Sequence, residues 1–164
     1  MSSDEGSLLV EVGVGGLAVA THPERLTTPA LGSCVGVALW DPAAKKGGLA
    51  HVMLPVAGKS TEHPNSGRFA AWAVPELVRL LVRSGAKQAR LRAKLAGGAA
   101  MFGSETFMSQ IGERNLAEVH YQLAIASIPI VAQDVGGNHA RSVELVLDSG
   151  VLVVRSYKFG TCQL

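Results

Sequence analysis

The residues of this sequence best suited to chemistry are one thiol and one imidazole. Cys34 directly follows Leu31-Gly32-Ser33, and His51 lies in the segment 48–55 with the sequence GLAHVMLP. A thiolate and an imidazole are the two groups that cysteine-dependent amide hydrolysis needs. Gly32 and Ser33 leave an open approach to the thiol, and the backbone N–H groups beside Cys34 are candidate oxyanion donors. The pair predicts a hydrolase site, provided that the two side chains meet.

The spacing of the pair permits that meeting across a hairpin with a turn-rich link at 41–47. If Trp40 faces Gly47, His51 becomes a diagonal neighbour of Cys34 on the same face, with roughly 7–8 Å between the backbones. A slip of one residue in this register would place the two side chains on opposite faces. The hypothesis therefore requires one register, unless Cys34 lies in a loop before its strand begins.

Ordinary structural roles explain the same residues. A cysteine in an apolar run is often a small core residue, and a histidine between Ala50 and Val52 is typical of a hydrogen-bonded core position. No carboxylate stands in these strands to orient His51, and Asp41 at the turn is expected to form the turn. A backbone carbonyl or a hydroxyl, from Thr27 or Thr28, is left to hold the imidazole.

The remaining elements surround this hairpin. The expected elements are a hairpin at 8–12 and 17–20, strands at 33–40, 48–54, 88–95, 130–135, 141–147 and 151–157, and helices from Ser66 to about Ser84 and from Ile111 to about Ala126. The expected inward residues are Phe69, Ala73, Leu77, Leu80 and Leu81 in the first helix and Leu116, Val119, Leu123 and Ala124 in the second. Pro75 should kink the first helix or start another, and Gly85 should end it. Strands on both sides of two helices favour one α+β domain over residues 1–164.

Composition excludes several classes of protein. Apolar residues make up 48% and charged residues 17%, which fits a folded domain and excludes a disordered chain. The net charge of +2 comes from scattered basic residues, so no nucleic-acid partner is expected. The chain has no apolar run long enough to cross a bilayer, and its polar, acidic start is unlike a signal peptide. A cytoplasmic protein that is not inserted in a membrane is therefore expected, with Cys34 and Cys162 unpaired.

No cofactor or metal site is predicted. Residues 13–18, GVGGLA, match a dinucleotide-binding fingerprint, but that fingerprint requires a helix to open there. Pro23 and the β-branched residues nearby argue against such a helix. His22 and His63 lie in polar loops, and His120 is expected on the solvent face of the second helix.

Six segments, two of them those that carry Cys34 and His51, occur in a characteristic order along the chain. They are Leu31–Val35, Leu39–Pro42, Gly48–Pro55, Lys94–Phe102, Ile111–Asn115 and Asp134–Asn138, followed by Arg141-Ser142-Val143. With these residues the sequence resembles the chemoreceptor glutamine deamidase family, CheD, over nearly its whole length. The sequence departs from the family pattern at Ala30, Gln133 and His139, which bears on substrate preference and partner contacts.

This resemblance implies a Cys-His-Thr triad at Cys34, His51 and Thr28 and a layered α/β sandwich with mixed, mostly antiparallel sheets. It implies hydrolysis of selected glutamine side chains on methyl-accepting chemotaxis receptors to glutamate and ammonia. It also implies the phosphatase CheC as a partner. The alternatives are another cysteine amidohydrolase or peptidase with the same pair, and an adaptor that binds receptors or CheC without turnover.

Further residues are candidates for contacts with the receptor or a partner. Gly97-Gly98 and Gly136-Gly137-Asn138 are candidates to line a groove for the receptor helix, although turns that need positive φ explain them equally well. Phe102 is a candidate partner contact or a core aromatic residue. Arg68 and Arg141 are candidates to pair with acidic receptor residues, against the ordinary expectation of solvated arginines.

Overall fold

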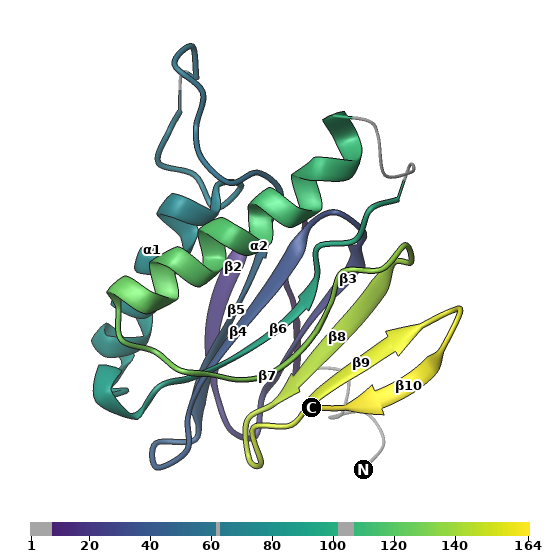
Figure 1. Cartoon of the computed structure of the whole chain (residues 1–164). Coiled ribbons are helices and arrows are strands. Elements are labelled where there is room, and N and C mark those ends of the chain that lie inside the picture. Colours follow the sequence, from purple (N-terminus) through teal and green to yellow (C-terminus); the bar gives the residue numbers. More distant parts are fainter. Residues whose placement is uncertain (1–7, 62, 102–106) are drawn as a thin grey trace.

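The protein is built from two five-stranded sheets and two helices in three layers (Figure 1). The computed structural model describes residues 8–61, 63–101 and 107–164, with the backbone alone at 107–109. Helices α1 (Ala70–Ser84) and α2 (Phe107–Ile125) cover one face of the central sheet, and the second sheet packs on its other face. This arrangement agrees with the expected α+β layered sandwich.

The central sheet has the strand order β2-β5-β4-β6-β7. Its strands are β2 (Leu17–Thr21), β4 (Val35–Asp41), β5 (Lys46–Val52), β6 (Arg92–Gly97) and β7 (Ile130–Val135). All neighbours are antiparallel except β6 and β7, which are parallel. Trp40 pairs with Gly47 and Gly36 pairs with His51, so the hairpin adopts the expected register.

The outer sheet has the strand order β1-β3-β8-β9-β10. Its strands are β1 (Leu9–Glu11), β3 (Arg25–Leu31), β8 (Arg141–Val146), β9 (Leu152–Ser156) and β10 (Gly160–Gln163). Only the β1–β3 pair is parallel. The ladder between β3 and β8 shifts register between Thr28 and Leu31, where Ala30 has a φ of 60°. Ala30 thus occupies the left-handed region that favours glycine.

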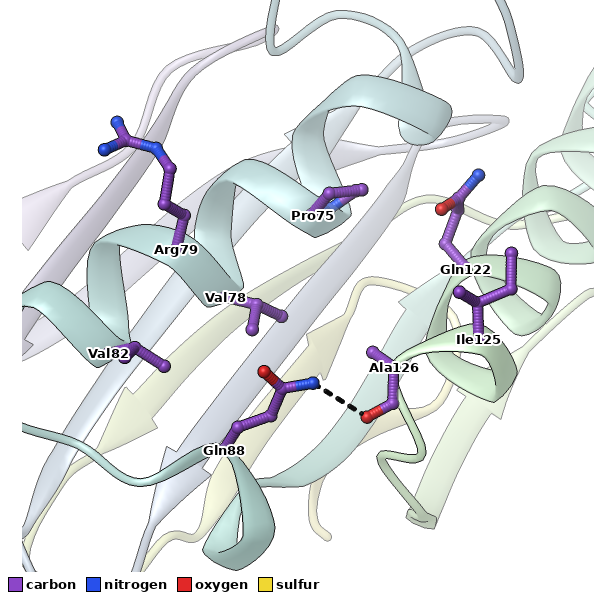
Figure 2. A pocket seen from close by; sticks show the side chains of 8 residues that line it. All are labelled: Pro75, Val78, Arg79, Val82, Gln88, Gln122, Ile125 and Ala126. Atoms are coloured by element: carbon purple, nitrogen blue, oxygen red, sulfur yellow. Dashed lines mark hydrogen bonds between the residues drawn. The ribbon is translucent and has the colours of Figure 1, made fainter.

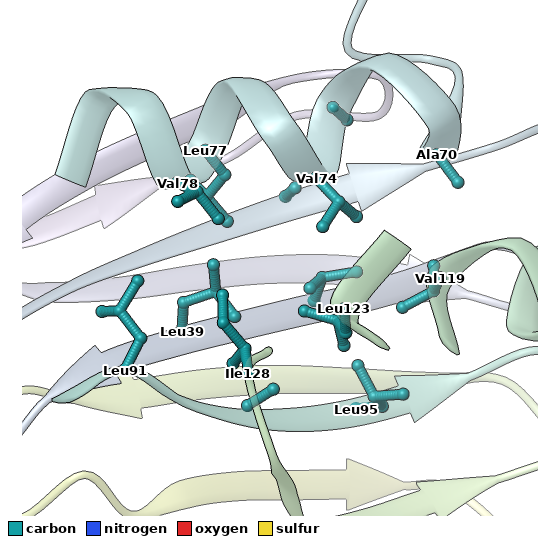
Figure 3. Close-up of a cluster of buried hydrophobic side chains, with 14 of the residues drawn as sticks. Leu39, Ala70, Val74, Leu77, Val78, Leu91, Leu95, Val119, Leu123 and Ile128 are labelled. Carbon is teal, nitrogen blue, oxygen red and sulfur yellow. The ribbon is translucent and has the colours of Figure 1, made fainter. Parts of the chain in front are cut away.

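Two apolar clusters hold the layers together. The first lies between the helices and the central sheet and includes Leu39, Leu77 and Leu123, all almost fully buried (Figure 3). The second lies between the sheets and includes Leu26, Leu49 and Leu145. Alternate residues of the central strands therefore face different cores, which explains why β4 and β5 are buried along almost their whole length.

The expected N-terminal hairpin is wrong. Strand β1 pairs with β3 in the outer sheet, whereas β2 pairs with β5 in the central sheet. The glycine-rich residues between them carry the chain from one sheet to the other, and the N–H of Gly15 donates to the carbonyl of His51. This segment is a turn without a helix, so the structural condition for a dinucleotide fingerprint is not met.

The helices also differ in detail from expectation. Helix α1 begins after Phe69, because Ser66 instead forms the preceding turn by accepting the N–H groups of Arg68 and Phe69. The helix runs unbroken past Pro75 and ends at Gly85 as expected. Helix α2 begins four residues earlier than Ile111. Of the residues expected to face inward, Leu80 is only half-buried and Ala124 is exposed, so the prediction for Ala124 is wrong.

The strands differ from expectation in three places. Strand β3 was not predicted, because Pro29 within it weakens the strand pattern. Residues 88–90 form a 3₁₀ turn, so only the later part of the expected strand at 88–95 is extended. The exposed strand β10 was also missed.

Candidate active site

A buried chain of hydrogen bonds joins His51 to the outer sheet. The Nδ1 atom of His51, on β5, lies 2.7 Å from Oγ1 of Thr28 on β3, and Thr28 Oγ1 lies 2.6 Å from the carbonyl oxygen of Val12. Both side chains are fully buried. The imidazole therefore points from the central sheet into the space between the two sheets.

These contacts determine which ring nitrogen carries the proton. The Val12 carbonyl can only accept, so the single hydroxyl proton of Thr28 is donated to it. Thr28 must then accept from His51, which places the imidazole proton on Nδ1. Nε2 is left with its lone pair, buried and without a hydrogen-bond partner among the described residues. An unpartnered Nε2 is chemically suited to take a proton from a nearby group.

Cys34 lies in a bend directly before β4, outside the paired register. It is half-buried and packs against the apolar cluster between the sheets, the same space into which His51 points. The thiol and the imidazole are therefore on the same side of the hairpin. No hydrogen bond joins Cys34 to His51 in this structure, whereas Thr28 and His51 are in direct contact.

Burial favours the neutral forms of both groups. Desolvation raises the pKa of the Cys34 thiol, an effect that its own backbone N–H partly offsets. Burial lowers the pKa of His51. The resting pair is therefore a thiol and a neutral imidazole, which suits a mechanism in which His51 removes the thiol proton before Cys34 attacks.

Hydrogen bonds connect the bend at Cys34 to two glycine turns. The N–H of Gly98 donates to the carbonyl of Cys34 at 2.8 Å, and the N–H of Gly136 donates to the carbonyl of Gly97 at 2.9 Å. All four predicted groove glycines have positive φ, as the turn interpretation requires. Gly97 has a second constraint, since a Cβ there would lie 2.2 Å from the carbonyl oxygen of Cys34. These turns support the thiol-bearing bend directly.

Sequence reasoning did not assign a site role to Asn115. This residue of α2 is fully buried, and its Nδ2 donates to the carbonyls of Ser33 and Met53 at 3.0 Å each. Asn115 lies one helical turn before buried Val119, so a polar residue on an apolar helix face was the available signal.

The other predicted contact residues are placed as follows. Arg141 is almost fully buried rather than solvated, because its guanidinium donates to the carbonyl of Gly136 and pairs with Asp134 at 3.3 Å. Arg141 therefore holds the glycine turn through the Gly136 carbonyl, and its charge is already paired with that of Asp134. Arg68 lies over the ring of Phe69. Phe102 lies outside the described residues.

An apolar groove of about 430 Å³ lies between the two helices, away from the predicted site residues (Figure 2). Its lining residues are Pro75, Val78, Arg79, Val82, Gln88, Gln122, Ile125 and Ala126. Gln88 closes one end by donating to the carbonyl of Ala126 at 3.0 Å. None of the predicted site residues lines this groove, so it does not belong to the thiol–imidazole site.

Within the described part of the chain, no three His, Cys, Asp or Glu side chains gather in a way that could hold a metal ion. In the same residues, neither helix combines the length and apolar character needed to cross a membrane. Cys34 and Cys162 are both free thiols, and Cys162 is exposed.

Comparison with known proteins places the chain among chemotaxis proteins. Residues 53–156 match the family model described as CheD chemotactic sensory transduction. The chain is 47% identical to the chemoreceptor glutamine deamidase CheD of Thermotoga maritima, over 88% of this chain and 89% of that protein. It is 43% identical to the probable chemoreceptor glutamine deamidase CheD of Moorella thermoacetica, over 90% of each chain. It is 39% identical to the chemoreceptor glutamine deamidase CheD of Bacillus velezensis, over 98% of each.

Proposed function

Because this chain belongs to the CheD family, we propose that it is a cysteine-dependent deamidase that converts glutamine side chains of chemoreceptors to glutamate. The observation that carries the proposal is the Thr28–His51 pair. Its hydrogen bonds leave Nε2 of a buried imidazole unprotonated and without a partner among the described residues, between the same two sheets where Cys34 packs.

The reaction begins with proton transfer from the Cys34 thiol to Nε2 of His51. The thiolate then attacks the glutamine Cδ and forms a tetrahedral oxyanion. The imidazolium gives its proton to the departing nitrogen, so that ammonia leaves and a thioester remains on Cys34. Nε2 next takes a proton from water, which attacks the thioester carbon. The second tetrahedral oxyanion collapses and expels the Cys34 thiolate, which takes the proton back from the imidazolium. The carboxylic acid product loses its proton to solvent, and the thiol and neutral imidazole are restored.

Thr28 orients the imidazole through both steps. Its hydroxyl accepts the Nδ1 proton and is itself fixed by the Val12 carbonyl. The backbone N–H of Cys34 serves the oxyanion, with the amide of Ser33 as a further candidate. The N–H of Gly32, which the sequence also suggested as a donor, is already donated to the carbonyl of Ala30 at 3.2 Å. Apart from the sulfur of its own residue, no acceptor of the Cys34 N–H exists among the described residues, so this donor is available to substrate.

We propose that the receptor helix lies over the glycine turns at 97–98 and 136–138, with its glutamine directed at Cys34. The hydrogen-bonded series of turns leads from Gly136 through Gly97 and Gly98 to the thiol-bearing bend, which supports this path. The reaction would take place in the cytoplasm, where the modified part of the receptor lies. The phosphatase CheC is the proposed regulatory partner, and co-purification of the two proteins tests that prediction.

The decisive experiment is incubation of the protein with a receptor cytoplasmic fragment, followed by peptide mass spectrometry. Wild type is expected to convert selected glutamines to glutamates without cutting the fragment. Cys34→Ala should abolish conversion, whereas Cys162→Ala, which removes the exposed thiol, should keep it.

The alternatives predict other results. A peptidase would shorten the receptor fragment. An adaptor would bind the fragment without conversion, and it would tolerate Cys34→Ala in the cell. Absence of conversion by wild type on several receptors would reject the deamidase proposal.

A further inference from the structure

Asn115 connects the two segments that carry the thiol and the imidazole. One of its Nδ2 protons is donated to the carbonyl of Ser33, directly before Cys34, and the other to the carbonyl of Met53, two residues after His51. Both partners are carbonyl oxygens and can only accept, so these contacts fix the orientation of the amide. One fully buried side chain thus fixes both segments relative to α2.

The contact with Ser33 has a direct consequence for the neighbouring N–H group. The carbonyl of Ser33 and the N–H of Cys34 belong to the same planar trans peptide, so they point in opposite directions. Fixing the carbonyl from the helix side therefore fixes the direction of the N–H. That N–H is the proposed oxyanion donor, and it has no competing acceptor outside its own residue among the described residues.

Resting on the proposed function, we infer that Asn115 is a positioning residue for the oxyanion donor of Cys34. The side chain acts through the Ser33–Cys34 peptide and does not touch the substrate. A donor helps only when it is already aimed at the developing negative charge, and a displacement of about 1 Å can lower the rate by about a hundredfold. The contact with Met53 limits movement of the second segment at the same time.

Two reactions of Cys34 separate this role from a general role in folding. Deamidation passes through an oxyanion and needs the aimed N–H. Alkylation of the thiol by iodoacetamide is a direct displacement at carbon, which forms no oxyanion and depends on the thiol and its base. A change at Asn115 should therefore affect the two reactions differently.

The experiment compares wild type with Asn115→Asp and Asn115→Leu, which replace the two N–H donors with an acidic and an apolar group of similar size. Gln110→Glu is the matched control, because it makes the same amide-to-acid change at an exposed position of α2. We measure kcat and KM for a receptor fragment, the rate of Cys34 alkylation across pH, and folding by circular dichroism.

The expected result for the Asn115 variants is a fall in kcat of about a hundredfold, with KM, the alkylation rate and its pH profile unchanged. Gln110→Glu should match wild type. Folded variants with normal kcat, equal losses in alkylation and deamidation, or failure of both variants to fold would each overturn the inference. If wild type itself lacks deamidation, the proposed function fails instead.

Discussion

Replacing Thr28 with valine tests the buried hydrogen-bond chain at His51. The substitution keeps the shape of the side chain but removes the hydroxyl that the Val12 carbonyl and the His51 Nδ1–H both use. Each buried group that loses its partner destabilises the fold by about 1–3 kcal/mol, so the free energy of unfolding should fall by about 4 kcal/mol. The hydroxyl also selects the reactive tautomer, and a loss of about 1–3 kcal/mol corresponds to a fall in kcat of about fivefold to about 150-fold.

Thr28→Ser is the control for this prediction, because it keeps both hydrogen bonds and removes one buried methyl group. It should cost about 1 kcal/mol in stability and leave kcat near that of wild type. Urea denaturation gives the stabilities, and mass spectrometry of the receptor fragment gives kcat. Wild-type turnover in Thr28→Val, or equal losses in both variants, would refute the role given to the hydroxyl.

Three further outcomes follow from the described contacts. Gly97→Ala should lower the free energy of unfolding by about 3 kcal/mol and abolish deamidation, because its Cβ would meet the Cys34 carbonyl. The control Gly160→Ala, at a position that also has positive φ but has open space around it, should keep activity. Equal losses of activity in the two variants would contradict this reasoning. Because burial lowers the pKa of His51, the unfolded chain takes up a proton below about pH 6.5 that the folded chain does not. Stability should therefore decline with acidification in urea titrations, and His51→Asn should reduce that decline. Burial tends to raise the pKa of Asp41, but the guanidinium of Arg90 and backbone amides outweigh it and lower this pKa to about 2. About 2 kcal/mol of stability should therefore be lost as pH falls from about 4 through 2. Asp41→Asn should lack this loss.

The hairpin was predictable because its pattern and its turn agree. Apolar residues on both faces indicate buried strands, and the turn at Asp41 sets the pairing of Trp40 with Gly47. That register, together with the bend before β4, places Cys34 on the same side as His51. Two local signals were therefore enough to bring the thiol and the imidazole into one region of the fold.

Residues held by long-range contacts were harder to find. Thr28 lies on β3, and Pro29 within this strand weakens the sequence pattern that would predict it. The contact of Thr28 with His51 crosses from one sheet to the other. Asn115 acts across 82 positions of sequence on the carbonyl of Ser33. Neither contact follows from periodicity, which describes the face of an element but not what packs on it. The family resemblance supplied Thr28, and only the structure supplied a role for Asn115.

The most direct test of the mechanism is detection of the thioester on Cys34. Mixing the protein with a receptor fragment, quenching in acid within the first turnover, and digesting the product allows the Cys34 peptide to be weighed. The mechanism predicts a covalent adduct that equals the glutamine-bearing segment less ammonia, located on Cys34, with none on Cys162. Glutamate formed at the wild-type rate by Cys34→Ala, together with no such adduct on either cysteine of the wild type, would contradict it.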